Sequence, residues 1–143
     1  MVRYNRILIC TDYSAASIKS FDKALPLAKS FNSEIHICHV VTPVASIPVH
    51  GYYYPMNIDL EKEAMQEAEL KMNALIESKG IEKDNIHIFF SDPKEGIVAI
   101  AKELKADLVM IAGHHHSFIG MLGSTANYVA NKIHCDVLII NDC

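Results

Sequence analysis

Arg6-Ile-Leu-Ile-Cys-Thr11 is a stretch whose interior is wholly apolar, with no alternation of polar and hydrophobic residues. Such a run is typical of a β-strand that is buried on both faces of a parallel sheet. Four further segments have the same character: Glu34–Val41, Ile86–Phe90, Leu108–Ala112 and Val137–Ile140. We therefore predict five buried strands.

Helical patterns lie between these strands. Apolar residues recur there at spacings of three and four, which is the periodicity of a helix with one buried face. The four faces comprise Ile18, Phe21, Leu25 and Ala28, then Leu60, Ala64, Ala68, Met72 and Leu75, then Ile97, Ile100, Ala101 and Leu104, and finally Ala126, Val129, Ala130 and Ile133. This alternation predicts right-handed βαβ units, and hence an α/β fold with a doubly wound, five-stranded parallel sheet flanked by four helices, Rossmann-like in class.

Local signals mark where the helices begin and end. Ser14 is placed to cap the first helix, Asp92-Pro93 opens the third, and Gly80 ends the second. Pro26 is the exception, because it falls inside the first helical pattern. A proline there has no N–H group, so it should kink the helix or remove a backbone hydrogen bond.

Length and composition indicate a single globular domain over residues 1–143. Half of the residues are hydrophobic and 21% are charged, as in a folded chain with one substantial core. The formal net charge is -4, from 13 basic and 17 acidic residues, and no basic stripe is visible. We therefore expect no nucleic-acid partner.

The chain carries no signal for a membrane or for export. No apolar run approaches the roughly 18 residues of a membrane span, and the first residues lead directly into a strand. We therefore expect a cytoplasmic protein without a membrane partner. The four cysteines, Cys10, Cys38, Cys135 and Cys143, form no C-x-x-C pair, so we expect reduced thiols that serve as small hydrophobic side chains.

The segment from Thr42 to Asp59 is too long for a minimal connection, and it contains Tyr52-Tyr53-Tyr54. Long loops in α/β domains are often lids or partner surfaces, and clustered exposed aromatic residues usually contact something. The alternative is a mobile insertion whose tyrosines pack on the nearest helix. Both interpretations stay open at this point.

An anion site is predicted where the fourth strand passes into the fourth helix. Ala112-Gly113 ends the strand, three histidines follow, and Gly123-Ser124-Thr125 begins the helix. The first N–H groups of a helix lack intrahelical partners and the macrodipole is positive there, which favours an anion. Gly-Ser before a helix is also the pattern of ordinary capping, so the capping interpretation stands beside the anion site.

Asp12 follows the first strand and supplies the second part of this expected site. In open parallel sheets ligands bind at the carboxyl ends of the strands, where the strand order reverses. If the first and fourth strands are neighbours, Asp12 lies opposite the glycine-bounded loop, where a carboxylate suits a ribose hydroxyl or a bound cation. A turn or cap residue before Ser14 is the alternative role for Asp12.

The remaining motifs argue against metal and catalytic chemistry. His114-His115-His116 cannot all point at one ion, and no further motif of ligand spacing accompanies them, so we expect no metal site. The functional alternative is a ring N–H of His115 or His116 that contacts a phosphate. The sequence has no P-loop lysine motif, no G-x-S-x-G elbow and no pair of carboxylates at helical spacing beside the loop, so we predict no catalytic residues.

Several segments together resemble the universal stress protein family. They are Ile7-Leu-Ile-Cys-Thr-Asp-Tyr-Ser14, the Ala24 and Ala28 pair, Ile37-Cys-His-Val40, Ala106-Asp-Leu-Val-Met-Ile-Ala-Gly113, Gly123-Ser-Thr-Ala126 and Cys135-Asp-Val-Leu-Ile139. The resemblance covers essentially the whole chain, in order. It implies an adenine nucleotide alpha hydrolase-like sheet, a homodimer joined through the last strand (Val137 to Ile140), and ATP or AMP bound where the strand order reverses.

Carried over position by position, the resemblance also implies which residues bind the nucleotide. Adenine and ribose would be surrounded by Cys10, Thr11, Asp12 and Val40; the phosphate loop would begin with Ala112 and Gly113; and the phosphates would be held by Gly123, Ser124 and Thr125. His115 is the candidate for one more phosphate contact. The only metal expected is a Mg²⁺ ion that accompanies the nucleotide.

The loop departs from the family's nucleotide-binding signature, G-x2-G-x9-G-[ST]. Gly113 and Gly123 are ten positions apart rather than thirteen, and His116 stands in place of the second glycine. A branch of the family with Gly-His-His and a similarly short loop is generally regarded as not binding ATP, whereas Gly123-Ser-Thr-Ala-Asn127 resembles the nucleotide binders. The shortened loop suits a monophosphate better than a triphosphate.

Three functions follow from these observations. We favour a stress-response regulatory module that binds an adenine nucleotide at the carboxyl ends of the parallel strands. The second is a nucleotide-free, dimeric interaction protein with the same fold. The third is an enzyme such as a slow phosphohydrolase.

Overall fold

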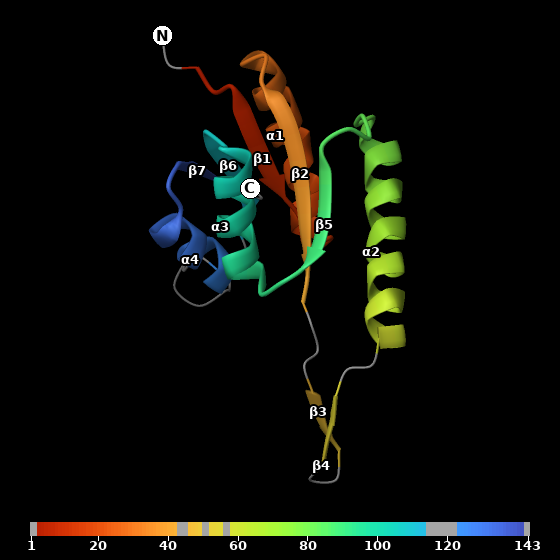
Figure 1. Ribbon diagram of the computed structural model, residues 1–143. Helices are drawn as coiled ribbons and strands as arrows, with labels where there is room; N and C mark the ends of the chain where they lie inside the picture. Colours follow the sequence, from red (N-terminus) through yellow and green to blue (C-terminus); the bar gives the residue numbers. More distant parts are fainter. Residues whose placement is uncertain (1–2, 43–45, 50–51, 56–57, 114–122, 142–143) are drawn as a thin grey trace.

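The computed structural model describes residues 3–42, 46–49, 52–55, 58–113 and 123–141 (Figure 1). In chain order the elements are β1 (Arg6–Cys10), α1 (Ala15–Ser30), β2 (Glu34–Val41), β3 (Ser46–Val49), β4 (Tyr52–Pro55), α2 (Ile58–Lys79), β5 (Ile86–Phe90), α3 (Pro93–Leu104), β6 (Leu108–Ala112), α4 (Ser124–Lys132) and β7 (Asp136–Ile140).

The main sheet has the order β5-β2-β1-β6-β7, and every neighbouring pair is parallel. β1 lies at its centre, where Ile7, Leu8 and Ile9 are at most 1% exposed. The chain adds β2 and β5 on one side of β1 and β6 and β7 on the other, so the strand order reverses between β1 and β6. This confirms the predicted doubly wound, five-stranded parallel sheet and locates its switch point.

Two helices cover each face of this sheet (Figure 1). α1 and α2 pack on one face through a core that includes Phe21 and Met72. α3 and α4 pack on the other face through a core that includes Ile97 and Val129. Both faces are therefore buried, which is why the strands are near-continuous apolar runs.

The prediction of five strands was too low, because the segment between β2 and α2 contains a second sheet. β3 and β4 form an antiparallel hairpin in which Ser46 is opposite Pro55 and Val49 is opposite Tyr52. The hairpin extends away from the main sheet, beyond the end of β2 (Figure 1). Ile, Val and Tyr favour strands, whereas the prolines had suggested a loop; proline is tolerated in an edge strand.

The side chains of Tyr52, Tyr53 and Tyr54 lie outside the described part of the structure. The hairpin does show that the long connection has regular secondary structure on both sides of its midpoint.

The predicted helix boundaries are confirmed. Ser14 caps α1 by accepting a hydrogen bond from the Ser17 N–H at 3.2 Å, and Asp92 caps α3 by accepting one from the Lys94 N–H at 2.9 Å. α2 ends immediately before Gly80, whose φ of 65° lies in the left-handed region that glycine adopts without strain.

Pro26 does not interrupt α1, which continues through it to Ser30. A proline removes the hydrogen bond to the carbonyl four residues earlier, here that of Asp22. Both Pro26 and Asp22 are exposed, so water can replace the missing donor. The predicted loss of a backbone hydrogen bond therefore follows from Pro26, and the helix continues because the unpaired carbonyl faces solvent.

Two predicted helix faces are only partly buried. In α2, Ala68, Met72 and Leu75 are buried, whereas Leu60 is 49% exposed. A helix of 22 residues is about 33 Å long, so its first turns extend past the strands that it covers. In α4, Ala130 is likewise exposed. Among the described residues, no helix is both long and apolar enough to cross a membrane.

Candidate functional site

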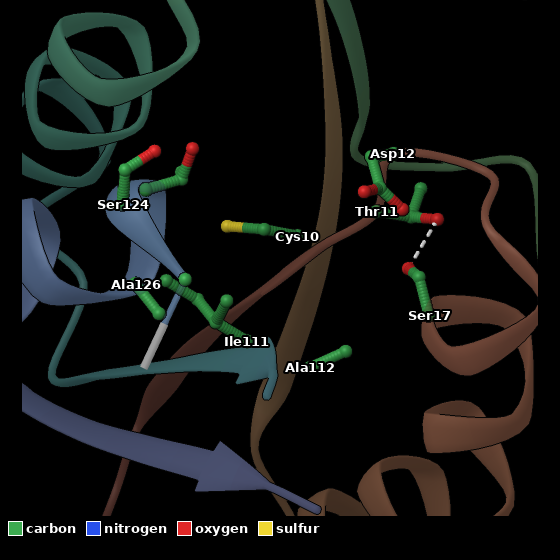
Figure 2. Close-up of a pocket in the computed structure, with 10 residues that line it drawn as sticks. Cys10, Thr11, Asp12, Ser17, Ile111, Ala112, Ser124 and Ala126 are labelled. Carbon is green, nitrogen blue, oxygen red and sulfur yellow. Dashed lines mark hydrogen bonds between the residues drawn. The ribbon is translucent and has the colours of Figure 1, made fainter. Parts of the chain in front are cut away.

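A cavity of about 310 Å³ lies at the switch point, where the carboxyl ends of β1 and β6 meet the first turns of α1 and α4. Figure 2 shows Ser124 and Ala126 on one side of it and Thr11, Asp12 and Ser17 on the other. The lining consists of Cys10, Thr11, Asp12, Ser17, Ile111, Ala112, Gly123, Ser124, Thr125 and Ala126. The ends of two strands and the first turns of two helices, far apart in sequence, thus share one concave site.

Seven of the predicted site residues line this cavity. They are Cys10, Thr11, Asp12, Ala112, Gly123, Ser124 and Thr125. The expectation that Asp12 faces the start of the fourth helix therefore describes the geometry correctly. The reason is the pairing of β1 with β6, which brings both strand ends to the same edge of the sheet.

Both the main chain and the side chain of Thr11 are held by hydrogen bonds. Its N–H donates to the carbonyl of Cys38 at 3.0 Å, and its own carbonyl accepts from Nδ1 of His39 at 2.8 Å. Its hydroxyl oxygen accepts from the Tyr13 N–H at 3.1 Å and from the Ser17 hydroxyl at 2.7 Å. These bonds fix the turn that leads from β1 into α1, and with it the rim of the cavity.

Tyr13 anchors this turn to α2. Its φ of 63° lies in the left-handed region, which is uncommon for a residue other than glycine. Its ring packs on His39 with 4.1 Å between the ring centroids, and its hydroxyl donates to the carbonyl of Ala68 at 2.7 Å. Burial raises the pKa of Tyr13 and lowers the pKa of His39, so both side chains are uncharged at neutral pH.

Asp12 performs the turn role that was its alternative interpretation, and it also lines the cavity. Its Oδ1 atom accepts a hydrogen bond from the Ser14 N–H at 2.9 Å. The residue is exposed, and each oxygen of a carboxylate can accept more than one hydrogen bond. Capping and ligand contact are therefore compatible for this side chain.

The first turn of α4 faces the cavity without a capping side chain. Gly123 is the N-cap residue, and Ser124 is already helical, so the ordinary serine cap that the sequence suggested is not formed. No side chain accepts from the first amides of α4 within the described residues. Because the macrodipole is positive at this end, the arrangement can bind an anion.

Two predicted residues do not line the cavity, and a third cannot be placed. The side chain of Val40 is buried in the core beside α3. Its main chain follows Cys38, which forms the last β1–β2 pair with Cys10, and therefore lies beyond the end of β1. The N–H of Gly113 donates to the carbonyl of Ile140 at 2.8 Å, so it extends the ladder between β6 and β7. His115 lies outside the described residues.

Gly113 has a structural reason to be glycine. A Cβ atom added at this position would overlap Oδ1 of Asn141 and would lie 3.0 Å from Cγ2 of Ile139. A side chain at this position would therefore fit only if the side chains of Ile139 and Asn141 shifted. The sequence analysis assigned this glycine to a phosphate loop, whereas its described contacts belong to strand packing.

Sequence reasoning missed three lining residues, Ser17, Ile111 and Ala126. Ile111 and Ala126 were assigned only to a strand and a helix face, because periodicity does not show which apolar residue borders a cavity. Ser17 is 2% exposed and lies three residues after the cap Ser14, a spacing that directs it back toward the end of β1. That spacing was the signal available in the sequence.

Cys10 and Cys38 are free thiols, as expected, with 3.5 Å between their sulfur atoms. The hydrogen bond with Cys38 and burial raise the pKa of Cys10 well above its usual range. Cys10 is therefore a protonated, nearly apolar part of the cavity wall. Across the described residues, no group of three metal-ligating side chains could hold an ion.

Comparisons with known proteins agree with this geometry. A family model described as the universal stress protein family matches residues 3–141. A universal stress protein of Methanocaldococcus jannaschii is 31% identical, covering 96% of this chain and 82% of that protein. Universal stress protein A homolog 1 of Coxiella burnetii is 29% identical and covers 97% of both chains.

Two solved structures share the fold. Universal stress protein UspA from Lactobacillus plantarum has a TM-score of 0.75 and 23% identity, with 98% of this chain and 99% of that chain covered. A universal stress protein in complex with cAMP has a TM-score of 0.65 and 25% identity, with 97% and 98% covered.

Proposed function

The chain belongs to the universal stress protein family, and on that premise we propose that it is a stress-response regulatory module that binds an adenine nucleotide in the switch-point cavity. The observation that carries the proposal is that one cavity is lined by Asp12, by the buried hydroxyls of Thr11 and Ser17, and by the first turn of α4, which has no capping side chain. A similar universal stress protein binds cAMP, which is a nucleotide of the same class.

Each part of an adenine nucleotide has a suitable partner in this arrangement. Cys10, Ile111 and Ala126 form apolar surface for the base, and the main chain of Val40 offers polar groups beyond the end of β1. The carboxylate of Asp12 accepts from ribose hydroxyls. The amides at the start of α4 donate to phosphate.

The proposal is for binding rather than turnover. The described lining contains no lysine, no histidine and a single carboxylate, Asp12, so it lacks both the lysine of a P-loop and a pair of groups for acid–base catalysis. ATP and AMP are both candidate ligands, and a Mg²⁺ ion would come with the nucleotide. Asp12 is the described lining residue that could contact such an ion.

Thermal unfolding with and without nucleotide tests the proposal. Ligand that binds only the folded protein stabilises it by about 2.7 kcal/mol at a hundredfold excess over Kd. The protein must first be shown by mass spectrometry of released small molecules to be free of copurified nucleotide. Indifference of this ligand-free protein to millimolar AMP, cAMP and ATP would leave the nucleotide-free interaction protein as the better account.

A pair of variants tests the position of the site. Gly123→Val places branched bulk where the phosphate should approach α4, so we expect nucleotide affinity to fall by at least about tenfold. Ala99→Val introduces the same side chain on the exposed side of α3, outside the cavity lining, and should leave affinity unchanged. Wild-type affinity in a folded Gly123→Val variant would show that the phosphate lies elsewhere.

The proposal also includes a homodimer formed through β7. β7 is an edge strand, and the carbonyl of Ile140 faces β6 because it accepts from Gly113. Main-chain groups alternate in direction along a strand, so those of Val137 and Ile139 face outward. Pairing with a second copy across a two-fold axis would satisfy them.

A further inference from the structure

We propose that His36 and His87 form a pH-sensitive latch, which holds the edge strand β5 on the main sheet at neutral pH and releases it in mild acid. The latch joins β2 to β5, whereas the proposed nucleotide site lies between β1 and β6. The inference is therefore independent of that site. It is carried by a chain of polar contacts across β1, β2 and β5 and by the position of His87 on the edge strand.

The two histidines lie side by side because of the strand register. His87 is opposite Cys38 in the β2–β5 pair, and His36 precedes Cys38 by two residues. Alternate residues of a strand point to the same face, so both rings lie on the face that α3 covers. The rings stack with 5.2 Å between their centroids, and Nδ1 of His36 is 2.9 Å from Nε2 of His87.

The other ring nitrogen of His36 is held by Glu34. Nε2 of His36 is 2.6 Å from Oε1 of Glu34, and this hydrogen bond lowers the pKa of the Glu34 carboxyl group. An ionised carboxylate can only accept, so Nε2 of His36 carries a proton. Nε of Arg6 lies 3.4 Å from the same carboxylate oxygen. Glu34 therefore keeps the His36 ring oriented with its Nδ1 atom toward β5.

The contact between the two rings has room for one proton. When both rings are neutral, Nδ1 of His36 is a lone pair and accepts from the Nε2–H group of His87. One added proton makes one ring cationic and leaves this hydrogen bond in place. A second added proton puts N–H groups on both facing nitrogens, so the hydrogen bond is lost and two like charges face each other. The pair can bind the second proton only when the rings separate.

His87 is the ring that can leave. His36 is 5% exposed and is held by Glu34, whereas His87 is half-buried on an edge strand. His87 lines a groove of about 600 Å³ between β5 and α3, and Glu103 of α3 lines the same groove. Burial and then the charge of His36 lower the pKa of His87, although Glu103 opposes both effects. We expect a protonated His87 ring to turn from His36 toward Glu103, which opens the side-chain contact between β5 and β2.

The sign of the pH dependence follows from the number of protons that each state binds. In the unfolded chain both imidazoles bind protons near pH 6.5, at about their ordinary pKa. The folded pair resists the second proton, so below this pH the folded state binds fewer protons than the unfolded state. The stability that the latch supplies is therefore complete above about pH 6.5 and is lost as the pH falls through the lowered pKa of His87. One missing proton lowers the folding equilibrium constant by up to about tenfold per pH unit.

Hydrogen exchange of the wild-type protein at about pH 7 and about pH 5 tests the latch directly, because Glu34 remains ionised over this range. Observed rates are divided by the intrinsic rate at each pH, which gives a protection factor for each amide. We expect protection in the β2–β5 ladder to fall by at least about tenfold. The β6–β7 ladder, at the other edge of the sheet, is the internal control and should change less. Equal changes in the two ladders would overturn the proposal.

A variant with a matched control assigns the effect to the latch. His87→Gln keeps a hydrogen-bonding side chain that cannot be protonated, so the loss of stability between about pH 7 and about pH 5 in urea unfolding should shrink by about tenfold in the folding equilibrium constant. His39 contributes pH dependence of the same sign, because burial lowers its pKa, so each variant is compared with the wild type. His134→Gln is the control, because His134 is exposed beside β7, and it should match the wild type.

Wild-type pH dependence in His87→Gln would refute the latch. If this variant fails to fold, the exchange measurement on the wild type still decides the proposal. Glu103→Gln tests the direction in which the ring turns, because it removes the carboxylate from the groove. We expect the loss of β5 protection to move to lower pH in this variant. An unchanged midpoint would show that protonated His87 does not turn toward α3.

Discussion

The hydrogen bond between the hydroxyls of Thr11 and Ser17 leads to a quantitative prediction about the stability of the ligand-free protein. The two oxygens are 2.7 Å apart, and the side chains belong to residues that are 6% and 2% exposed. Thr11 accepts, and both Ser17 and the N–H of Tyr13 donate to it. Removing the acceptor, Thr11, should therefore lower the free energy of unfolding more than removing one donor, Ser17.

The magnitudes follow from counting the groups left without a partner. Thr11→Val keeps the shape but leaves two donors, the Ser17 hydroxyl and the Tyr13 N–H, without an acceptor, which should cost about 2 kcal/mol or more. Ser17→Ala removes one donor and leaves Thr11 still accepting from Tyr13, so we expect about 1 kcal/mol. In the double variant one of the two orphaned donors is gone, so its cost should be close to that of Thr11→Val alone.

Urea unfolding of the wild type, both single variants and the double variant measures this cycle. We expect a coupling of about 1 kcal/mol, with the double variant more stable than the sum of the single effects predicts. Additive effects, or a larger cost for Ser17→Ala than for Thr11→Val, would refute the assigned direction of the hydrogen bonds. The m-value should stay constant, because neither change alters the surface exposed on unfolding.

Three further predictions concern other parts of the fold. The hydrogen bond with His36 lowers the pKa of Glu34 in the folded protein. The ionised Glu34 side chain therefore stabilises the fold at pH values above its unfolded-state pKa of about 4.3, and this stabilisation is lost as the pH falls through the folded-state pKa. In urea unfolding at several pH values, Glu34→Gln should reduce the loss of stability on the acid side. Gly96→Ala should lower the free energy of unfolding by about 1–2 kcal/mol in chemical denaturation, because the added Cβ would lie 3.0 Å from Cγ1 of Val40. This crowding should outweigh the better helix propensity of alanine, and a variant as stable as the wild type or more stable would contradict it. Ile139→Pro should abolish dimers in sedimentation equilibrium while circular dichroism shows an intact fold, and a wild-type protein that is monomeric at high micromolar concentration would refute the dimer itself.

Local sequence patterns predicted most of the main sheet and its helices. The five buried strands are apolar on both faces, and a parallel sheet covered by helices is the arrangement that buries such strands. Ser14 and Asp92 could be recognised as caps because a cap depends on neighbouring residues only. The β3–β4 hairpin was missed because its prolines resemble a loop when the antiparallel pairing is not known.

The candidate site was predictable wherever its residues lie at strand ends and helix starts. Asp12 and Ser124 could be placed opposite each other from the rule that ligands bind at the switch point, once β1 and β6 were assumed to be neighbours. Family resemblance extended this set to Cys10 and Thr11. It also assigned Gly113 to the phosphate loop, whereas in the fold its N–H group pairs with β7.

The sequence by itself determined the elements of the main sheet and its helices, their order, and the edge of the sheet at which a ligand should bind, because periodicity and capping are properties of adjacent residues. Only the tertiary structure decided which strands are neighbours, which side chains border the cavity, and where the hydrogen bonds of Thr11 and Gly113 go. These depend on contacts between residues far apart in the chain. The hydrogen bond between the Ser17 and Thr11 hydroxyls, whose oxygens are 2.7 Å apart, likewise forms only when the first turn of α1 packs against the end of β1.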